Sequence, residues 1–170
     1  MKNFILGIVS TSLIMLISYC AYPYLKSTDT TVKNVILPNY SIKYNIKSDI
    51  EKDVKSATIE AKKNNKNILL FVGGEWCKWC RALDKYLDTH KELQSTIFKN
   101  YKVVKAYYGG NMSKKNKDYL NKFPKIQGTP HIYVLDQNGK FVYSQGTGYF
   151  EDGSSYNLKK IKSFLEKYIK

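Results

Sequence analysis

Two cysteines separated by two residues, Cys77 and Cys80, are the side chains of this sequence best suited to chemistry. They follow a short apolar run and open an amphipathic stretch, which places them at the start of a helix. There, side chains three residues apart share a face, and their Cβ atoms are about 5–6 Å apart. Small conformational changes can bring such a pair to the Cβ distance of about 3.5–4.5 Å that a disulfide needs. The positive end of the helix dipole favours the thiolate of Cys77. The spacing therefore predicts a redox-active disulfide, with Cys77 as the attacking thiol and Cys80 as the resolving thiol.

The residues around this pair are expected to support its chemistry. A cation at Lys78 favours a thiolate at the first cysteine, and the ring of Trp79 restricts access to Cys80. Trp76 is expected to shield the site and to offer an apolar contact, although an ordinary core aromatic would fit the same position. Glu75 is either a solvated carboxylate or a group that accepts a proton from Cys80 through water.

The spacing of apolar residues predicts the strands that position the cysteines. Residues 67–72 form an apolar run that ends at a Gly pair, as is typical of a strand buried on both faces. A second strand is expected at 101–108, parallel to the first across a right-handed crossover. Residues 131–135 and 140–144 flank a turn and predict an antiparallel hairpin. The sheet is therefore expected to be mixed, within an α/β fold.

Helical spacing predicts elements that cover both faces of this sheet. Ser48 and Glu51 match a capping box, after which a helix is expected to run until Asn64 and Asn65. Ser113 is expected to cap a short helix that ends before Phe123-Pro124. The expected inner positions of the long helices are Ile50, Val54, Ala57 and Ala61, then Leu83, Tyr86 and Leu87, and finally Leu158, Ile161, Phe164, Leu165 and Ile169.

Two separated motifs carry a family resemblance. The stretch 75–80 reads Glu-Trp-Cys-Lys-Trp-Cys and continues Arg-Ala-Leu-Asp, and Gly128-Thr129-Pro130 follows further on. In this order they resemble the active-site turn and the cis-proline loop of the thioredoxin superfamily, most of all secreted thioredoxin-like domains and the C-terminal domain of DsbD. The resemblance implies a thioredoxin-like fold over 48–170, with a cis peptide bond before Pro130. It also implies that the backbone of Thr129 faces the cysteines and pairs with an extended substrate.

The sequence departs from the family pattern at two places. Thioredoxins carry a buried Asp six residues before the first active-site cysteine, where this chain has Phe71. Lys78 and Trp79 replace the Gly-Pro that the family places between the cysteines. Neither departure fixes the direction of electron flow.

The resemblance implies an enzyme that exchanges disulfides with cysteine-containing protein substrates and with a redox partner protein, acting more as a reductase than as an oxidase. No organic cofactor and no metal are expected for this chemistry. The alternative is a non-catalytic copper-binding or copper-delivery protein on the same fold, with copper(I) held by the soft thiolates of Cys77 and Cys80 and with His131 nearby. Structural zinc needs four ligands, and His90 and His131 are far apart in the sequence.

Composition favours a single monomeric domain that does not bind nucleic acid. The 170 residues carry a formal net charge of +14, but Arg81 is the only arginine among 28 basic residues. Arginine is the preferred residue for bidentate contacts with phosphates and bases, so its scarcity argues against sequence-specific recognition of nucleic acid. The lysines are spread along the chain and are expected to form a solvated surface.

The N-terminal part predicts export. Residues 1–25 begin with a basic end and continue without a charged residue from Phe4, which fits a signal peptide or an uncleaved membrane anchor. Cys20 stands where lipoproteins carry a lipidated cysteine, but Tyr19 before it is large, so an apolar role within this segment is preferred. Residues 26–47 are expected to be a polar linker. The predicted location is periplasmic or otherwise extracytoplasmic, either with or without an anchor in the membrane.

Overall fold

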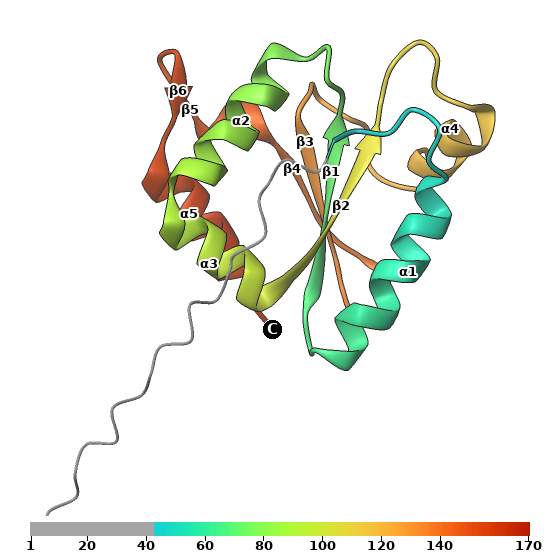
Figure 1. The fold of residues 1–170 in the computed structure, drawn as a ribbon, viewed down its shortest axis with the longest axis horizontal. Coiled ribbons are helices and arrows are strands. Elements are labelled where there is room, and N and C mark those ends of the chain that lie inside the picture. Colours follow the sequence, from blue (N-terminus) through green and yellow to red (C-terminus); the bar gives the residue numbers. More distant parts are fainter. Residues whose placement is uncertain (1–42) are drawn as a thin grey trace, which may run out of the picture. The chain divides into compact units, whose positions relative to one another are not determined.

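The computed structural model describes residues 43–170, which form a sheet with helices on both faces (Figure 1). The sheet has four strands in the order β2-β1-β3-β4. β1 pairs with β2 in parallel and with β3 antiparallel, and β4 pairs antiparallel with β3. The expected mixed sheet is therefore confirmed. The strands are β1 Asn67–Gly73, β2 Tyr101–Tyr107, β3 His131–Leu135 and β4 Phe141–Gly146.

Five helices cover this sheet (Figure 1). Their bounds are α1 Ile50–Lys63, α2 Lys78–Thr89, α3 Lys91–Asn100, α4 Lys114–Leu120 and α5 Leu158–Lys167. Apolar residues of α1 and α4 form one core cluster with one face of the sheet, and those of α2, α3 and α5 form a second cluster with the other face. The sheet thus has one apolar core on each face. α2 begins shortly after the end of β1, and the cysteines lie at this junction.

β1 lies between two neighbouring strands and is buried on both faces. Leu69 and Phe71 contribute to the core beneath α2, whereas Ile68, Leu70 and Val72 contribute to the core beneath α1. Alternate side chains of a strand point to opposite faces, so a strand covered on both sides needs an apolar residue at every position. The unbroken apolar run seen in the sequence is explained by this double burial.

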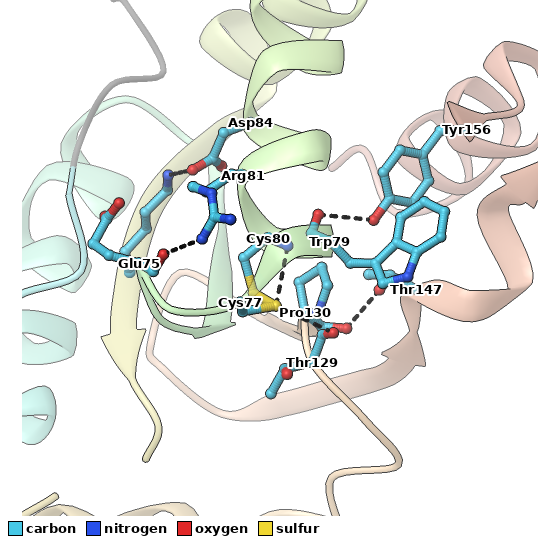
Figure 2. The surroundings of a disulfide bond; sticks show 11 residues. Glu75, Cys77, Trp79, Cys80, Arg81, Asp84, Thr129, Pro130, Thr147 and Tyr156 are labelled. Atoms are coloured by element: carbon cyan, nitrogen blue, oxygen red, sulfur yellow. Dashed lines mark hydrogen bonds and ion pairs between the residues drawn. A yellow bond between two sulfur atoms is a disulfide. The ribbon is translucent and has the colours of Figure 1, made fainter. Parts of the chain in front are cut away.

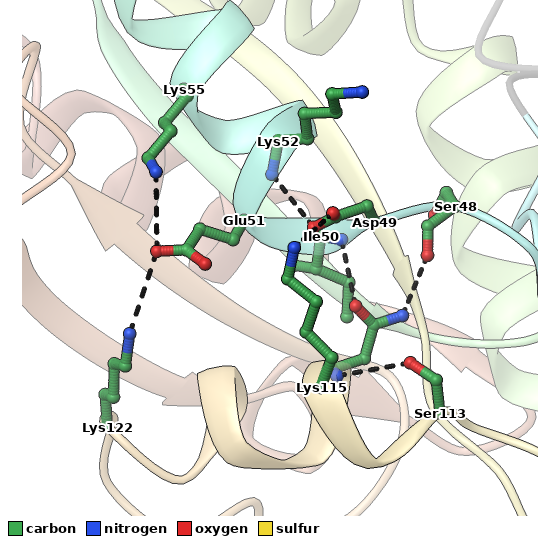
Figure 3. A network of polar contacts seen from close by, with 10 residues as sticks. Ser48, Asp49, Ile50, Glu51, Lys52, Lys55, Ser113, Lys115 and Lys122 are labelled. Carbon is green, nitrogen blue, oxygen red and sulfur yellow. Dashed lines mark hydrogen bonds and ion pairs between the residues drawn. The ribbon is translucent and has the colours of Figure 1, made fainter.

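The first helix begins one residue later than the capping box predicts. Asp49, not Ser48, is the N-cap of α1, and its carboxylate accepts the N–H of Lys52 at 3.2 Å (Figure 3). The amide of Asn116, from α4, donates to the backbone carbonyl of Ser48 and accepts the N–H of Ile50. The contact with α4 thus fixes the start of α1, and the expected Ser48 cap is wrong.

The C-terminal part contains elements that the sequence did not predict. A 3₁₀ turn, η1 Thr147–Phe150, follows β4, and two short strands, β5 Glu151–Asp152 and β6 Ser155–Tyr156, pair before α5. Ile169, expected on the inner face of the last helix, lies beyond its end and is 41% exposed. Residues 1–25 and most of 26–47 lie outside the described residues. Within 43–170, no helix is long and apolar enough to cross a membrane.

Candidate active site

The two cysteines form a disulfide at the N-terminus of α2 (Figure 2). Cys77 is the N-cap of the helix, so the helix itself begins at Lys78, and the Cys77 Sγ accepts the N–H of Cys80 at 3.1 Å. The Cα atoms are 5.2 Å apart. Cys77 is 5% exposed and Cys80 is 1% exposed. The sulfur of Cys77 therefore faces the free N–H groups of the helix end, which stabilise negative charge at that position.

The Thr129-Pro130 segment lies against this disulfide, although it is about 50 residues further along the chain. Its peptide bond is cis, as the resemblance implied. The carbonyl oxygen of Thr129 lies 3.4 Å from the Cys77 Sγ, and the hydroxyl of Thr147 donates a hydrogen bond to the carbonyl of Pro130 (Figure 2). Thr147 is buried in the turn after β4, so its hydrogen bond holds the Thr129-Pro130 segment in place. The backbone edge of Thr129 is thereby kept beside Cys77.

The two tryptophans next to the cysteines differ in their surroundings. Trp76 is 57% exposed and lines a hollow of about 1200 Å³ together with Tyr107, Tyr108 and other mostly apolar side chains. Trp79 is half-buried and packs edge-on against Tyr156, with ring centroids 5.4 Å apart. The hydroxyl of Tyr156 also donates to the carbonyl of Trp79 at 3.0 Å. Trp76 is thus an accessible aromatic surface beside the disulfide, and Trp79 is held by Tyr156 of the β5–β6 hairpin.

The remaining expected site residues are exposed. The side chain of Lys78 lies at the surface beside Cys77, where its charge adds to that of the helix end. Glu75 is also exposed, and its Oε1 accepts the backbone N–H of Tyr44 at 3.0 Å. The guanidinium of Arg81 donates to the backbone carbonyl of Glu75 (Figure 2). The carboxylate of Glu75 thus holds a distant chain segment, and its proposed exchange of a proton with Cys80 remains a prediction.

The sequence of residues 54–161 matches the family model of the thioredoxin-like domain. The chain belongs to the thioredoxin-like family. It is similar to the disulphide isomerase of Xylella fastidiosa Temecula1, with 30% identity over 73% of this chain and 94% of that chain and a TM-score of 0.58. Two other solved structures were matched. They are a DsbH oxidoreductase, with 24% identity, 66% and 81% coverage and a TM-score of 0.46, and the oxidised C-terminal domain of Neisseria meningitidis DsbD, with 14% identity, 66% and 90% coverage and a TM-score of 0.47. The comparison with curated proteins gave no match.

A carboxylate does lie beneath this thioredoxin-like site, but it comes from the helix and not from β1. Phe71 is buried where thioredoxins carry their Asp, as the sequence indicated. Asp84, on α2, forms an ion pair with Lys105 of β2 at 2.5 Å, and the lysine side chain is 1% exposed. Burial raises the pKa of the Asp84 carboxyl, and the hydrogen bond from Lys105 opposes that effect. A lysine inside an apolar strand was the signal that could have revealed this pair.

Tyr44 is a second residue of the site that sequence reasoning missed. It lies in the segment 26–47, expected to be a linker, yet it is only 7% exposed and packs with Cys77 and Cys80. A residue ahead of Ser48, where the sequence places the start of the domain, therefore packs against the cysteines. Nothing in the local sequence distinguishes Tyr44 from its polar neighbours, because its burial depends on residues more than 30 positions away.

His131, the third ligand considered for copper, does not share a face of the sheet with α2. Its ring packs against Tyr133, on the side covered by α1 and α4, with centroids 4.7 Å apart. Its Nε2 forms a hydrogen bond with the Oγ of Ser144 at 2.8 Å. Within residues 43–170, no group of three or more His, Cys, Asp or Glu side chains could hold a metal ion. A copper site here would have to consist of the two cysteine sulfurs without His131.

Proposed function

We propose that this chain is a thiol:disulfide oxidoreductase that reduces disulfides of cysteine-containing proteins outside the cytoplasm. The observation that carries the proposal is the Cys77–Cys80 disulfide at the N-terminus of α2, with the carbonyl of Thr129 beside it. Belonging to the thioredoxin-like family supports the same chemistry. The similar protein from Xylella fastidiosa is named a disulphide isomerase, which also acts through exchange between thiols and disulfides.

The proposed reaction moves two electrons from the dithiol to the substrate. The Cys77 thiolate attacks one sulfur of the substrate disulfide, whose bond breaks, and the other substrate sulfur leaves as a thiolate and takes up a proton. The Cys80 thiolate then attacks the Cys77 Sγ of the mixed disulfide. The second substrate sulfur leaves with its electron pair, and the Cys77–Cys80 disulfide forms. A redox partner protein must then return two electrons before the next cycle, and no organic cofactor takes part.

The direction of the reaction is supported by the burial of the sulfurs. A reduced pair gains stability over the uncharged disulfide when one of its sulfurs is held as a thiolate, and burial disfavours that charged form. Cys80 is 1% exposed, so burial favours the oxidised pair over a reduced pair that carries charge. A pair that prefers the disulfide has a low reduction potential and donates electrons readily. This preference fits a reductase.

The substrate edge and the location complete the proposal. An extended substrate segment pairs with the backbone of Thr129, and an apolar side chain of the substrate contacts the exposed ring of Trp76.

The uncharged stretch that starts at Phe4 delivers the domain across the membrane and either anchors it there or is removed. The chain acts as a monomer, and neither nucleic acid nor a metal ion is a partner.

Insulin reduction with trapping variants tests the function. The wild type is expected to reduce insulin, and Cys77→Ser is expected to be inactive and to form no adduct. Cys80→Ser is expected to accumulate a mixed disulfide on Cys77, because the group that resolves it is gone. Cys20→Ser is the matched control and keeps full activity. Trapping by Cys77→Ser in place of Cys80→Ser, or tight stoichiometric copper without disulfide exchange, would contradict the proposal.

The reduction potential of the Cys77–Cys80 pair tests the direction separately. A value near the ~−270 mV of thioredoxin supports a reductase, and a value near the ~−120 mV of DsbA supports an oxidase. Equilibration with glutathione or dithiothreitol buffers, followed by gel analysis of alkylated thiols, gives this value. N-terminal sequencing of protein from cell fractions tests the location, since a soluble product starting after Ala21 would reject a membrane anchor.

A further inference from the structure

Tyr44 reaches the active site from a segment that precedes the helices and strands of the domain. Its backbone N–H donates to the Oε1 of Glu75 at 3.0 Å, which fixes the segment to the turn before the cysteines. Its ring lies beneath the ammonium group of Lys105, with 5.0 Å between the nitrogen and the ring centroid. The side chain is more than nine-tenths buried. Tyr44 is thus held in place by two charged residues.

The hydroxyl of Tyr44 faces the same space as the sulfur of Cys80. A Cβ atom on Gly73 would lie 2.5 Å from the Cys80 Sγ and 3.1 Å from the Tyr44 Oη. Among the described residues, the Oη is buried and has no hydrogen-bond partner. A buried hydroxyl without a partner is unfavourable, and a disulfide sulfur is a weak acceptor. A negatively charged sulfur is a much better acceptor.

We propose that Tyr44 is a catalytic residue of this site, whose hydroxyl donates a hydrogen bond to the Cys80 sulfur whenever that sulfur is a thiolate. The inference rests on the proposed thiol–disulfide exchange. It supplies the partner that the hydroxyl lacks in the oxidised form. Thioredoxins carry a buried Asp on β1, but this chain has Phe71 there, which offers no polar group to Cys80. The Tyr44 hydroxyl supplies a donor to that cysteine.

The tyrosine acts as a donor that keeps its proton. Burial raises the pKa of Tyr44 far above its usual value, and the negative charges of Asp84 and Glu75 raise it further. Across neutral pH the phenol therefore stays protonated beside Lys105, Asp84 and Glu75. When Cys80 attacks the mixed disulfide, the bond between Cys77 and the substrate sulfur breaks, and the electron pair leaves on that sulfur. The Tyr44 O–H bond stays intact throughout.

The same hydrogen bond serves the opposite half of the cycle. When a thiolate of the redox partner attacks the Cys77 Sγ, the Cys77–Cys80 bond breaks and Cys80 leaves as a buried thiolate. Burial alone would disfavour that thiolate. The Tyr44 hydroxyl stabilises it at the moment it forms, which accelerates both resolution of the substrate and reduction by the partner.

Titration of Cys80 in the absence of substrate tests this inference independently of the function. The full chain carries Cys20→Ser and Cys77→Ser, so that Cys80 is the remaining thiol, and thiolate absorbance is followed against pH. Adding Tyr44→Phe, which removes the hydroxyl and keeps the ring, is expected to lower the Cys80 thiolate fraction about tenfold at a given pH, as for the loss of about 1.4 kcal/mol. Tyr149→Phe, at a side chain 63% exposed, is the matched control and leaves the titration unchanged.

Kinetics in the full chain provide the second readout. Tyr44→Phe is expected to slow the release of a pre-formed mixed disulfide about threefold, because the higher nucleophilicity of a thiolate with a raised pKa offsets part of the tenfold loss of thiolate. The first attack by Cys77 is expected to keep its rate. If Tyr44→Phe leaves the Cys80 titration unchanged, the inference about Tyr44 is overturned, even if the wild type reduces insulin. If Tyr44→Phe alters the titration but the wild type reduces no disulfide, only the proposed reductase function is rejected. If Tyr44→Phe does not fold, the hydroxyl proton of Tyr44 in the wild type decides by NMR. Slower exchange with solvent on reduction supports the hydrogen bond, and equal exchange in both redox states overturns it.

Discussion

His131 makes the stability of this protein depend on pH, and the size of the effect follows from its surroundings. The side chain is fully buried, its Nε2 is paired with Ser144, and its Nδ1 has no partner among the described residues. Burial lowers the pKa of His131 from 6.5 to about 4. The folded protein therefore holds this ring neutral where the unfolded chain protonates it.

The sign of the effect follows from the number of bound protons. Between pH 6.5 and about 4, the unfolded state carries a proton on His131 and the folded state does not. Stability is therefore complete above pH 6.5 and falls as the pH drops toward 4. Each pH unit in this window lowers the free energy of unfolding by about 1.4 kcal/mol, so the total loss is about 3 kcal/mol. This is a large share of the 5–15 kcal/mol that is typical of a folded domain.

Urea unfolding between pH 4.5 and 7.5, followed by tryptophan fluorescence, measures this dependence. His131→Gln is expected to be less stable than the wild type at pH 7 and to lose about 3 kcal/mol less on acidification. The raised pKa of Asp84 acts in the opposite direction in both proteins and cancels in the comparison. Parallel curves for wild type and His131→Gln, or an NMR titration of the His131 ring near pH 6.5, would refute the reasoning.

Three further substitutions test the packing around the disulfide, each by urea unfolding of the oxidised protein. Gly73→Ala is expected to destabilise it by about 1–3 kcal/mol, because the new Cβ would lie 2.5 Å from the Cys80 Sγ; equal stability would contradict this. Thr147→Val removes the hydroxyl that donates to the carbonyl of Pro130, so a loss of about 1–3 kcal/mol and a raised KM for insulin are expected. Leu83→Ala opens a cavity in the core beneath α2, with an expected loss of about 2–5 kcal/mol, and a loss below 1 kcal/mol would argue against tight packing there.

Most of the fold could be predicted from local patterns, and the errors lie where distant residues decide. Ser48 and Asp49 are both good cap residues, so the sequence alone could not choose between them. The choice depends on Asn116, whose amide contacts the carbonyl of Ser48 and the N–H of Ile50. The short hairpin that carries Tyr156 was missed for a similar reason, since strands of two residues leave no periodic pattern.

The residues of the site likewise fall into those that a sequence motif reveals and those that only the fold brings together. The cysteines and their neighbours occupy one stretch of sequence, and the Thr129-Pro130 segment carries a motif of its own, so both could be recognised. Lys105 and Tyr44 belong to no motif. Their positions depend on the pairing of β1 with β2 and on a hydrogen bond to Glu75, which only the assembled fold provides.

The ion pair between Lys105 and Asp84 explains how the site tolerates Phe71. In the β1–β2 register, Phe71 is the direct partner of Lys105, so an Asp at position 71 would lie next to this lysine on the neighbouring strand. With an apolar residue there, the buried ammonium group still needs a negative partner, because an isolated buried charge is strongly unfavourable. Asp84 provides it from α2, one helical turn beyond Cys80. The carboxylate thus reaches the lysine from the helix that carries the cysteines and not from β1.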